Sequence, residues 1–569
     1  MNSIRSALAA GYHCLSAWAD LLDRINVFPV ADSDTGANLR ISLAPLRNPI
    51  MDQIRTRELI ARCAIGNSGN IAAAFFQEYC RAEQFADLAS NARQGSDKAR
   101  QALAVPRAGT MLDIFACLAR TLDSRALPTD LYSVLCREMQ GAVLATATML
   151  PQLREAGVVD AGALGMYIFF EGFFRHFAGL TNQPAVIPEL FTGKLSINAA
   201  FQAEPTDSYC VNAVIQPGKE GADAGDLAQL GDSVVVLPAE SGLKVHIHTA
   251  DRQRLRDRLS SYGEIVQWSD EAMATGDGTG SNSSGRQQVI HIMTDAAGSI
   301  TREMARQNSI TLLDSYIQAG DNSCPESLCP PAEIYALMRQ GAKISTAQAP
   351  DFERYQYYRS VCQQFGRTLY LCVGSVFTGN FATAIRWQKE NDPDNLLTIM
   401  DTGAASGRLG LIALLTARYA GQAVDPEDVL AFAQKLLFAC VEYVFIDQLR
   451  YLVAGGRVSR TGGMFADLLH LKPVISPTSA GVRKEGIAHS RKGQLSFALS
   501  RLRKDFSPAA APVIMLQYSD NESWVAQKVL PRVRAQLPQA EILFVPLSLT
   551  SGVHMGPGTW AMAWTGCAK

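Results

Sequence analysis

The sequence predicts a multidomain protein in which an all-α domain is followed by a small α+β domain and a larger α/β domain. Three observations support this prediction: the length of 569 residues, a change of hydrophobic pattern near residue 195, and a stretch rich in Gly, Ser and Asn at residues 275–288. Because domains usually contain about 100 to 200 residues, the chain has room for three or four of them.

The first domain, residues 1–193, is predicted to be helical throughout. Residues 6–25, 74–89 and 131–153 repeat apolar side chains with the 3.6-residue period of amphipathic helices, and β-branched runs are almost absent. The middle domain, residues 194–274, contains strand-like runs and one basic helical stretch: "YCVNAVI", "DSVVVLP", "LKVHIHTA" and "DRQRLRDRLSSYG". Residues 275–288 have the composition of a flexible linker.

The third domain, residues 289–569, alternates strand-like and helical stretches, a pattern that predicts an α/β fold with a mainly parallel sheet. Its strands end in Gly, Ser, Thr and Asp, as in "MTDAAGS", "CVGSVFTG" and "IMDTGAASG". Open α/β sheets bind ligands at the carboxyl ends of their strands, so we expect a ligand site there.

Charge and hydropathy exclude several classes of function. The chain carries 52 basic and 54 acidic residues and no basic run interleaved with aromatics, so nucleic acid is not an expected partner. The most apolar stretch, residues 162–180, is interrupted by Glu171, Arg175 and His176 and therefore fails the test of roughly 18 uncharged residues for a membrane span. At most a peripheral membrane contact is expected.

The sequence also predicts a cytoplasmic location. The first 23 residues have the period of an amphipathic helix and carry Asp20 and Asp23 where a signal peptide would need small residues. The twelve cysteines are scattered singly apart from Cys324 and Cys329, a distribution typical of free thiols in a reducing compartment.

An acidic motif, "NVFPVADSDTG", ends an apolar run at residues 26–36. Asp32 and Asp34 lie two residues apart, and Asn38 follows at the start of a predicted helix. Closely spaced carboxylates favour a cation, and Mg²⁺ prefers a few carboxylates together with substrate phosphates. The same residues could instead cap the helix through an Asx turn, and the motif alone leaves both interpretations open.

Three more helix starts carry small or hydroxyl residues: "AIGNSGN" at 64–70, "AGTMLDI" at 108–114 and "EAGVVDAGALG" at 155–165. Each alone is ordinary at a helix start, but together with the acidic motif they favour a nucleotide, because backbone N–H groups at helix N-termini bind phosphate.

These four motifs together resemble the DhaL-type domain of the dihydroxyacetone kinase superfamily, in the version found in bacterial fatty acid kinases. The resemblance covers about residues 1–190 and implies a barrel of antiparallel helices with ATP at one end. It differs from the family at Ser33 and Ala31, where Gly and Pro are usual, and it has Asn26 as the nearest polar residue upstream of Asp32. The resemblance implies that Mg²⁺ is bound by Asp32 and Asp34, and that the nucleotide is bound by Thr35, Asn38, Asn67, Ser68, Gly69, Thr110, Met111, Asp160 and Gly162.

A candidate Zn²⁺ set lies in the middle domain. His246 and His248 point to one face of a predicted strand, and Cys210 stands on another strand. Paired histidines on a strand are as often plain surface residues. The segments around them resemble the central domain of fatty acid kinases, which implies a zinc site formed by Cys210, His246 and His248.

Seven motifs between residues 289 and 565 resemble the DegV family, whose members present a fatty acid to the kinase. They are "IMTDAAGSI", "KISTAQAP", "VGSVFTGNFATA", "IMDTGAASGRLGL", "LRYLVAGGRVSR", "LLHLKPVI" and "VHMGPGTWAMAW". The resemblance implies two α/β lobes with a fatty acid between them, and it differs from the family at Ala347 and Asn380. The implied carboxylate contacts are Thr346, Thr378, Gly379, Arg457 and His554.

The chemistry of these side chains agrees with that role, because a carboxylate needs hydroxyl and N–H donors and a nearby cation. Taken alone, the segment around Arg457 could equally be a surface turn, and His554 could cap a loop.

The combined expectation is a fatty acid kinase that converts ATP and a fatty acid into ADP and an acyl phosphate for phospholipid synthesis. A fatty acid carboxylate is ionised at neutral pH, so transfer needs no general base, only positioning and charge neutralisation by Asp32, Asp34, Arg457 and His554. The linker would raise the effective concentration of the fused parts. We also expect a homodimer and an acyltransferase that accepts the product.

Two alternatives belong to other classes. The chain could be a fatty acid carrier with a degenerate kinase domain, or a kinase for a small hydroxylated substrate such as a triose.

Overall fold

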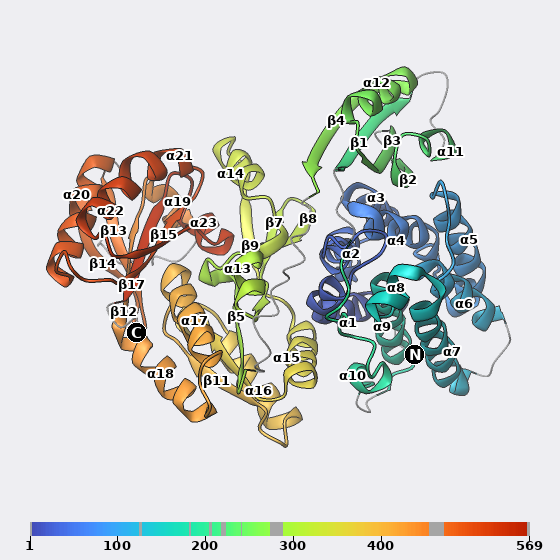
Figure 1. Ribbon diagram of the computed structural model, residues 1–569, viewed down its shortest axis with the longest axis horizontal. Helices are drawn as coiled ribbons and strands as arrows, with labels where there is room; N and C mark the ends of the chain where they lie inside the picture. The colour runs from blue at the N-terminus through green and yellow to red at the C-terminus, as the bar shows by residue number, and fades with distance from the viewer. Residues whose placement is uncertain are drawn as a thin grey trace. The chain divides into compact units, whose positions relative to one another are not determined.

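The computed structural model describes residues 3–123, 128–180, 184–203, 208–217, 224–239, 242–273, 288–454 and 471–565. The chain forms two compact units, which we call the first unit (Met1–Asn282) and the second unit (Ser283–Lys569) (Figure 1). Most of the predicted linker, residues 275–287, lies outside the described residues. None of the described helices combines the length and the hydropathy needed to cross a bilayer.

The first unit begins with a helical domain whose central helix is apolar on every side. Its helices are α1 (Ile4–Arg24), α2 (Thr35–Leu43), α3 (Gln53–Cys63), α4 (Gly66–Tyr79), α5 (Leu88–Gln101), α6 (Met111–Asp123), α7 (Pro128–Met149), α8 (Pro151–Ala156), α9 (Ala161–Phe177) and α10 (Ile187–Leu190), with the 3₁₀ turns η1 (Ala44–Arg47) and η2 (Phe85–Asp87).

Helix α9 is the apolar stretch of the sequence and is buried along nearly its whole length, which explains its composition. It packs along α1, where a Cβ at Gly172 would stand 2.6 Å from Cys14 Sγ. The buried Glu171 accepts a hydrogen bond from Tyr132 Oη at 2.7 Å, so this charge within the apolar helix is compensated.

The middle part of the first unit is an antiparallel sheet in the order β2-β3-β1-β4, covered by one helix. Its elements are β1 (Tyr209–Pro217), α11 (Ala224–Leu227), β2 (Asp232–Ala239), β3 (Gly242–Thr249), α12 (Arg252–Tyr262) and β4 (Gly263–Ala272). The apolar face, which includes Val211, Val245 and Ile247, packs on Leu255 and Leu259 of α12. Since strand side chains alternate, the other face carries the polar residues of β1 and β3.

Backbone pairing joins the sheet to the helical domain. Ala104 N donates to Val234 O at 3.2 Å, and Val236 N donates to Ala102 O at 2.9 Å, so the chain just after α5 extends the sheet beside β2. The polar face of the sheet is directed toward α3 and α4, which contact β2, while α4 also contacts β3.

The second unit contains three sheets. The first has the order β11-β10-β5-β6 and is parallel, the second has the order β8-β7-β9, and the third has the order β14-β13-β12-β17-β15-β16. The strands are β5 (His291–Asp295), β6 (Ile310–Leu313), β7 (Tyr316–Ala319), β8 (Asn322–Pro325), β9 (Ile344–Ala347), β10 (Thr368–Cys372), β11 (Leu397–Asp401), β12 (Cys440–Phe445), β13 (Lys472–Thr478), β14 (Gly481–Ala488), β15 (Val513–Tyr518), β16 (Glu541–Pro546) and β17 (Trp560–Thr565).

The helices of the second unit flank these sheets. They are α13 (Arg302–Gln307), α14 (Pro331–Arg339), α15 (Asp351–Phe365), α16 (Asn380–Asn391), α17 (Ser406–Ala420), α18 (Pro426–Ala439), α19 (Leu449–Ala454), α20 (Arg491–Asp505), α21 (Glu522–Trp524), α22 (Leu530–Gln536) and α23 (Leu549–Met555), with the short turns η3 (Ala296–Gly298), η4 (Glu326–Leu328) and η5 (Val525–Val529).

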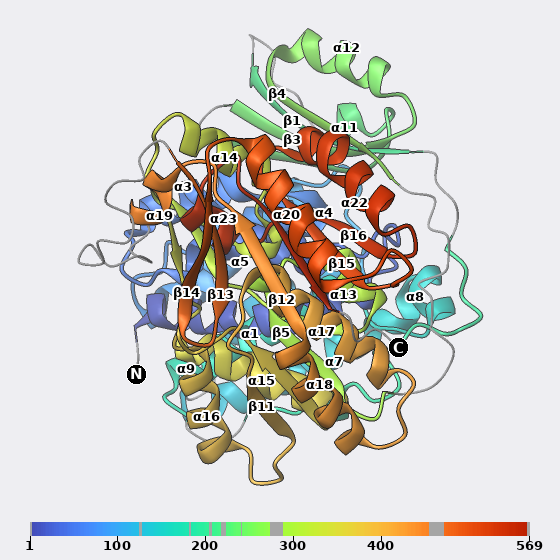
Figure 2. The ribbon, with the colours of Figure 1, turned by 90° about the vertical axis from the view of Figure 1, so that its left-hand side faces the viewer.

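The expectation of a mainly parallel sheet holds for the first sheet of this unit and not for the third. In the third sheet only β15 and β16 pair in parallel, because β13 and β14 are joined by a tight turn and β12 and β17 run antiparallel to their neighbours. Helix α17 contacts β5 and β10 of the first sheet and β12, β15 and β17 of the third, so one core serves both lobes (Figure 2).

Candidate functional site

The acidic motif forms the turn between α1 and α2. Its middle residue, Ser33, has a φ of 56°, a left-handed conformation that Gly adopts freely but that costs other residues about 1 kcal/mol or more. This turn brings the carboxyl groups of Asp32 and Asp34 into contact with each other. The backbone that places the two carboxylates together is therefore strained.

The two carboxylates stand in an environment that disfavours two negative charges. Desolvation and the Asp34 carboxylate raise the pKa of Asp32, although water still reaches its side chain and Asn26 Nδ2 donates to its Oδ1 at 2.5 Å. Desolvation also raises the pKa of Asp34, against the hydrogen bond from Asn38. A bound cation would remove this cost, so the pair fits a divalent metal.

Asp34 does not cap α2, and the capping alternative for this residue is therefore wrong. Asp34 stands at the N-cap position but makes no side-chain capping hydrogen bond. Asp23, at the end of α1, instead accepts from Gly36 N at 2.6 Å and from Ala37 N at 3.1 Å. Because Asp23 satisfies these donors, the Asp34 carboxylate is left facing its neighbour Asp32.

The start of α4 packs against the start of α2. Gly66 has a φ of +64°, and a Cβ there would stand 2.0 Å from Asn38 Nδ2, so no other residue fits without movement. Ser68 Oγ donates to Thr35 O at 3.4 Å, which brings the loop to the residue that follows Asp34.

The first turn of α4 offers groups to a ligand. Its N-cap residue, Ile65, has no side chain that bonds the first backbone N–H groups. Asn67 Oδ1 is buried without a hydrogen-bond partner among the described residues. Unsatisfied groups of this kind at a helix N-terminus can bind phosphate. The structure thus brings Asp32, Asp34, Thr35, Asn38, Asn67, Ser68 and Gly69 together.

A second group of predicted residues meets where α6 and α9 begin. Asp160 Oδ1 accepts from Ala163 N at 2.7 Å and caps α9, and burial raises the pKa of this carboxyl to about 7. A Cβ at Gly162 would stand 2.6 Å from Met111 Cε, and Thr110 precedes Met111. Asp160 therefore has a structural function of its own, beside the predicted nucleoside position.

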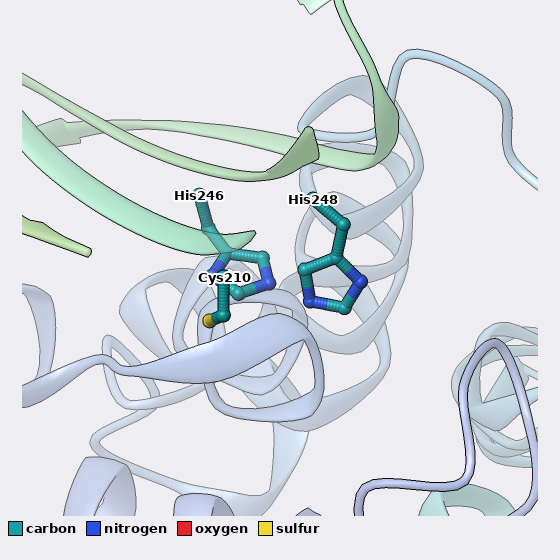
Figure 3. Close-up of side chains that lie close together, drawn as sticks. All are labelled: Cys210, His246 and His248. Atoms are coloured by element: carbon teal, nitrogen blue, oxygen red, sulfur yellow. The ribbon is translucent and has the colours of Figure 1, made fainter. Parts of the chain in front are cut away.

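Cys210, His246 and His248 form a compact set on the polar face of the middle sheet (Figure 3). Their ligand atoms all lie within 4.8 Å of one another. Asn212 Oδ1 contacts His246 Nδ1 at 3.0 Å, which leaves Nε2 for a metal, and neither His246 Nε2 nor His248 Nδ1 has a partner among the described residues.

The protonation states of this set suit a metal. Burial lowers the pKa of both histidines, that of His248 to about 4, so the rings are neutral and can donate lone pairs. Burial raises the pKa of Cys210 to about 12, and a bound Zn²⁺ would deprotonate this thiol. One thiolate and two imidazoles, with a fourth position open, match zinc.

The metal set and the acidic turn belong to one site. The charges of Asp34 and Asp32 reach Cys210 and contribute to its raised pKa. Glu271 pairs with Cys210 across β1 and β4, and its charge acts on both Cys210 and Asp34. The polar face of the sheet therefore stands over the carboxylates of the helical domain.

In the second unit, four of the five predicted carboxylate contacts are described, and they lie on three loops. Thr346 Oγ1 and His554 Nε2 are 3.1 Å apart, although 208 positions separate them in the chain. Thr378 Oγ1 accepts from Asn380 N at 3.2 Å, next to Gly379. Arg457 lies outside the described residues.

Asn380 ties these loops together. Its Nδ2 donates to Asp295 Oδ1 at 2.8 Å, and its Oδ1 accepts from Gln348 Nε2 at 3.0 Å. Asp295 ends β5 and Gln348 follows β9. The substitution of Asn for the family's usual residue thus serves to fix the loop that carries Thr378 and Gly379.

A buried charge supports this network from below. The Arg354 side chain lies 3.6 Å from Asp295 and is 2% exposed. Tyr370 Oη donates to Asp295 at 2.9 Å, and Val373 N donates to it at 2.8 Å. Asp295 therefore accepts from three separate elements, and such charge-assisted bonds are the stronger kind.

Sequence reasoning missed several residues that organise both sites. Asp23, Glu271, Asp295 and Gln348 act through contacts between distant segments, and no local motif indicates them. The only available signal was the position of Asp295 at the carboxyl end of a predicted strand.

Comparison with known proteins assigns a family to each part of the chain. A DAK2 domain model matches residues 29–175, and a model of the FakA-like middle domain of fatty acid kinase matches residues 206–278. A model of the uncharacterised DegV family matches residues 289–566.

Curated relatives match the first half of the chain. An uncharacterised protein of Staphylococcus haemolyticus is 28% identical over 296 residues, and protein YloV of Bacillus subtilis is 28% identical over 293 residues; each alignment covers 46% of this chain and 53% of the relative. The chain thus spans about half the length of the curated relatives it matches.

Solved structures match the other half. A DegV family protein from Thermus thermophilus, titled as fatty acid binding, is 23% identical with a TM-score of 0.44, and the alignment covers 48% of this chain and 99% of that one. DegV of Bacillus subtilis, titled a fatty acid binding protein, is 20% identical with a TM-score of 0.45 and coverages of 48% and 98%.

The helical and middle domains define the first unit as a kinase-family protein. More particularly, the chain joins a DAK2 domain and a FakA-like middle domain to a DegV-family domain in one polypeptide.

Proposed function

We propose that this chain is a fatty acid kinase that transfers the γ-phosphoryl group of Mg-ATP to a fatty acid carboxylate. The product would be an acyl phosphate for phospholipid synthesis. The observation that carries the proposal is the Asp32–Asp34 pair, which Asp23 relieves of helix capping and which stands beside Cys210, His246 and His248.

The first unit would bind the nucleotide. Asp32 and Asp34 would hold Mg²⁺, which when bound neutralises charge on the phosphates. The first turn of α4, with Asn67, Ser68 and Gly69, would orient the phosphates together with Thr35, Asn38 and Thr110, while Met111, Asp160 and Gly162 would lie near the nucleoside. Cys210, His246 and His248 would hold Zn²⁺ and link β1 to β3.

The second unit would supply the acceptor. Thr346, Thr378, Gly379 and His554 offer hydroxyl, backbone and imidazole donors to a carboxylate, and Arg457 would add positive charge. An ionised carboxylate is itself the nucleophile, so the chain needs to supply position and charge neutralisation rather than a base. The DegV family match supports a fatty acid as this acceptor. A cytoplasmic homodimer that passes its product to an acyltransferase completes the proposal.

The test is trapping of the acyl phosphate. We expect the purified intact chain with Mg-ATP and oleate or palmitate to give hydroxamate when hydroxylamine is added. Asp34→Asn should reduce hydroxamate at least about a hundredfold, because removing a ligand or a charge-stabilising group at a phosphoryl-transfer site costs that much. Asp97→Asn, an exposed aspartate on α5, is the matched control.

The alternatives predict other outcomes. A wild-type chain that carries extracted fatty acid but never yields hydroxamate would be a carrier rather than a kinase. ATP consumption with dihydroxyacetone, and none with fatty acids, would indicate a small-substrate kinase.

A further inference from the structure

Lys244 is the third polar residue on the face of β3 that carries the metal set. It lies two residues before His246 and four before His248, so all three side chains point to the same side of the strand. Unlike the two histidines, Lys244 does not face the metal position.

The Lys244 ammonium group reaches into the helical domain. Lys244 Nζ donates to Arg62 O at 3.0 Å and also to Ala64 O. Helix α3 ends at Cys63, and the last carbonyl groups of a helix have no partners within it. A cation at this end also opposes the negative pole of the helix dipole. Lys244 therefore acts as a C-terminal cap supplied by another domain.

The capped segment leads directly into the loop proposed to bind phosphate. Only Ile65 separates Ala64 from Gly66, the first residue of α4. Ile65 N donates to Ser42 Oγ of α2 at 3.0 Å. The turn between α3 and α4 is thus held from one side by α2 and from the other by Lys244.

We propose that Lys244 is a positioning residue for the nucleotide, which holds the α3–α4 turn so that the first turn of α4 faces the phosphates. This inference rests on the proposed kinase function and adds that the middle domain completes the nucleotide site. Strand β3 then has two separate roles in the reaction, because it carries the metal-binding histidines and fixes the phosphate loop.

Mg-ADP binding to the intact chain tests the inference without the need for catalysis. We expect Lys244→Met to weaken Mg-ADP binding in isothermal titration roughly tenfold or more, since hydrogen bonds to a charged group are among the stronger ones. Lys244→Arg keeps the charge and should recover part of the affinity. Lys98→Met, an exposed lysine on α5, should bind as wild type does.

Two further readouts separate positioning from stability. Hydrogen exchange at residues 64–69 should speed up in Lys244→Met and stay unchanged in Lys98→Met. The KM for ATP should rise more than kcat falls. A Lys244→Met chain that is less stable but binds Mg-ADP with wild-type affinity overturns the inference.

The inference and the proposed function fail in different ways. Wild-type chain that binds Mg-ADP but forms no hydroxamate contradicts the kinase and leaves the role of Lys244 intact. Wild-type chain that binds no Mg-ADP contradicts both.

Discussion

The two candidate sites differ in how their polar groups are satisfied. In the first unit, Asn67 Oδ1, His246 Nε2 and His248 Nδ1 lack partners among the described residues, and Asp32 faces Asp34. In the second unit, the polar groups bond one another: Thr346 with His554, and Asn380 with Asp295 and Gln348.

This difference teaches where each unit obtains its order. Unpaired buried polar groups and like charges are costly, so we expect cations and phosphate to complete the first site. The hydrogen-bonded network of the second site is preorganised, and a ligand adds to it or competes with it. The first site should respond most to ligands, and the second to the loss of its own side chains.

The largest expected effect comes from breaking the network of the second unit. Asp295→Ala leaves the buried Arg354 without its carboxylate, and loss of one partner of a buried pair costs about 3 to 5 kcal/mol. Denaturant unfolding of the whole chain, followed by fluorescence of Trp387, which packs on Tyr358, measures the change. The exposed Asp394→Ala should have no effect. A loss below about 1 kcal/mol would mean that the network is not preorganised.

A smaller effect should follow in the first unit from loosening a metal ligand. Asn212→Ala removes the acceptor that orients His246, and such outer partners are worth about 10- to 100-fold in metal affinity. Competition with a chromophoric zinc chelator measures the affinity, with Gln267→Ala on the exposed strand β4 as control. Unchanged affinity would show that Asn212 has no part in the metal site.

The pH dependence of stability sharpens the comparison further. Burial raises the pKa of Glu326 to about 7, although Thr550 N and Thr550 Oγ1 both donate to its carboxylate at 2.7 Å; the charges of Asp314 and Asp295 raise it further. The folded chain therefore holds this proton more tightly than the unfolded chain, and stability is lost as pH rises from about 4.5 through 7.

Glu326→Gln removes that charge. It should be more stable than wild type at pH 8 by about 1 to 2 kcal/mol, and the advantage should disappear near pH 4. Denaturant unfolding at several pH values tests this, with the exposed Glu333→Gln as control. If the stability curves of the wild type and of Glu326→Gln stay parallel across this range, the prediction is wrong.

The smallest effect concerns two serines with the same backbone strain. Ser33 and Ser299 both have a φ of 56°, but Ser299 Oγ accepts a hydrogen bond from Ser548 N at 2.9 Å. Ser33→Gly should raise stability by up to about 1 kcal/mol, whereas Ser299→Gly should lower it, because the lost bond outweighs the relief of strain. Thermal unfolding compares the two, and equal shifts would contradict the assignment of strain at Ser33.

The sequence predicted the parts of the molecule that local patterns determine. Periodicity indicated the helices of the first unit, and alternation indicated β1, β2 and β3 close to their observed bounds. Strand β4 was missed because it pairs only with β1 at an edge of the sheet and lacks a clear apolar alternation. The antiparallel pairing in the third sheet depends on which strands meet, and no single segment encodes it.

The candidate sites follow the same rule. The acidic pair and the two histidines were visible because they are close in sequence. The roles of Asp23, Lys244 and Asn380 were not, because each acts on a segment at least 13 positions away in the chain. Asp34 illustrates the limit: only the position of Asp23 shows that Asp34 is not needed as a helix cap.

Helix α17 has a consequence for how the second unit can be divided. Its side chains complete the cores of both α/β lobes, and Glu442 of the third sheet accepts from Gly407 N and Arg408 N at its first turn, at 3.0 and 3.1 Å. A lobe expressed alone would expose one side of this helix or lose it entirely. The second unit is therefore inherited, exchanged between proteins and degraded as a single piece.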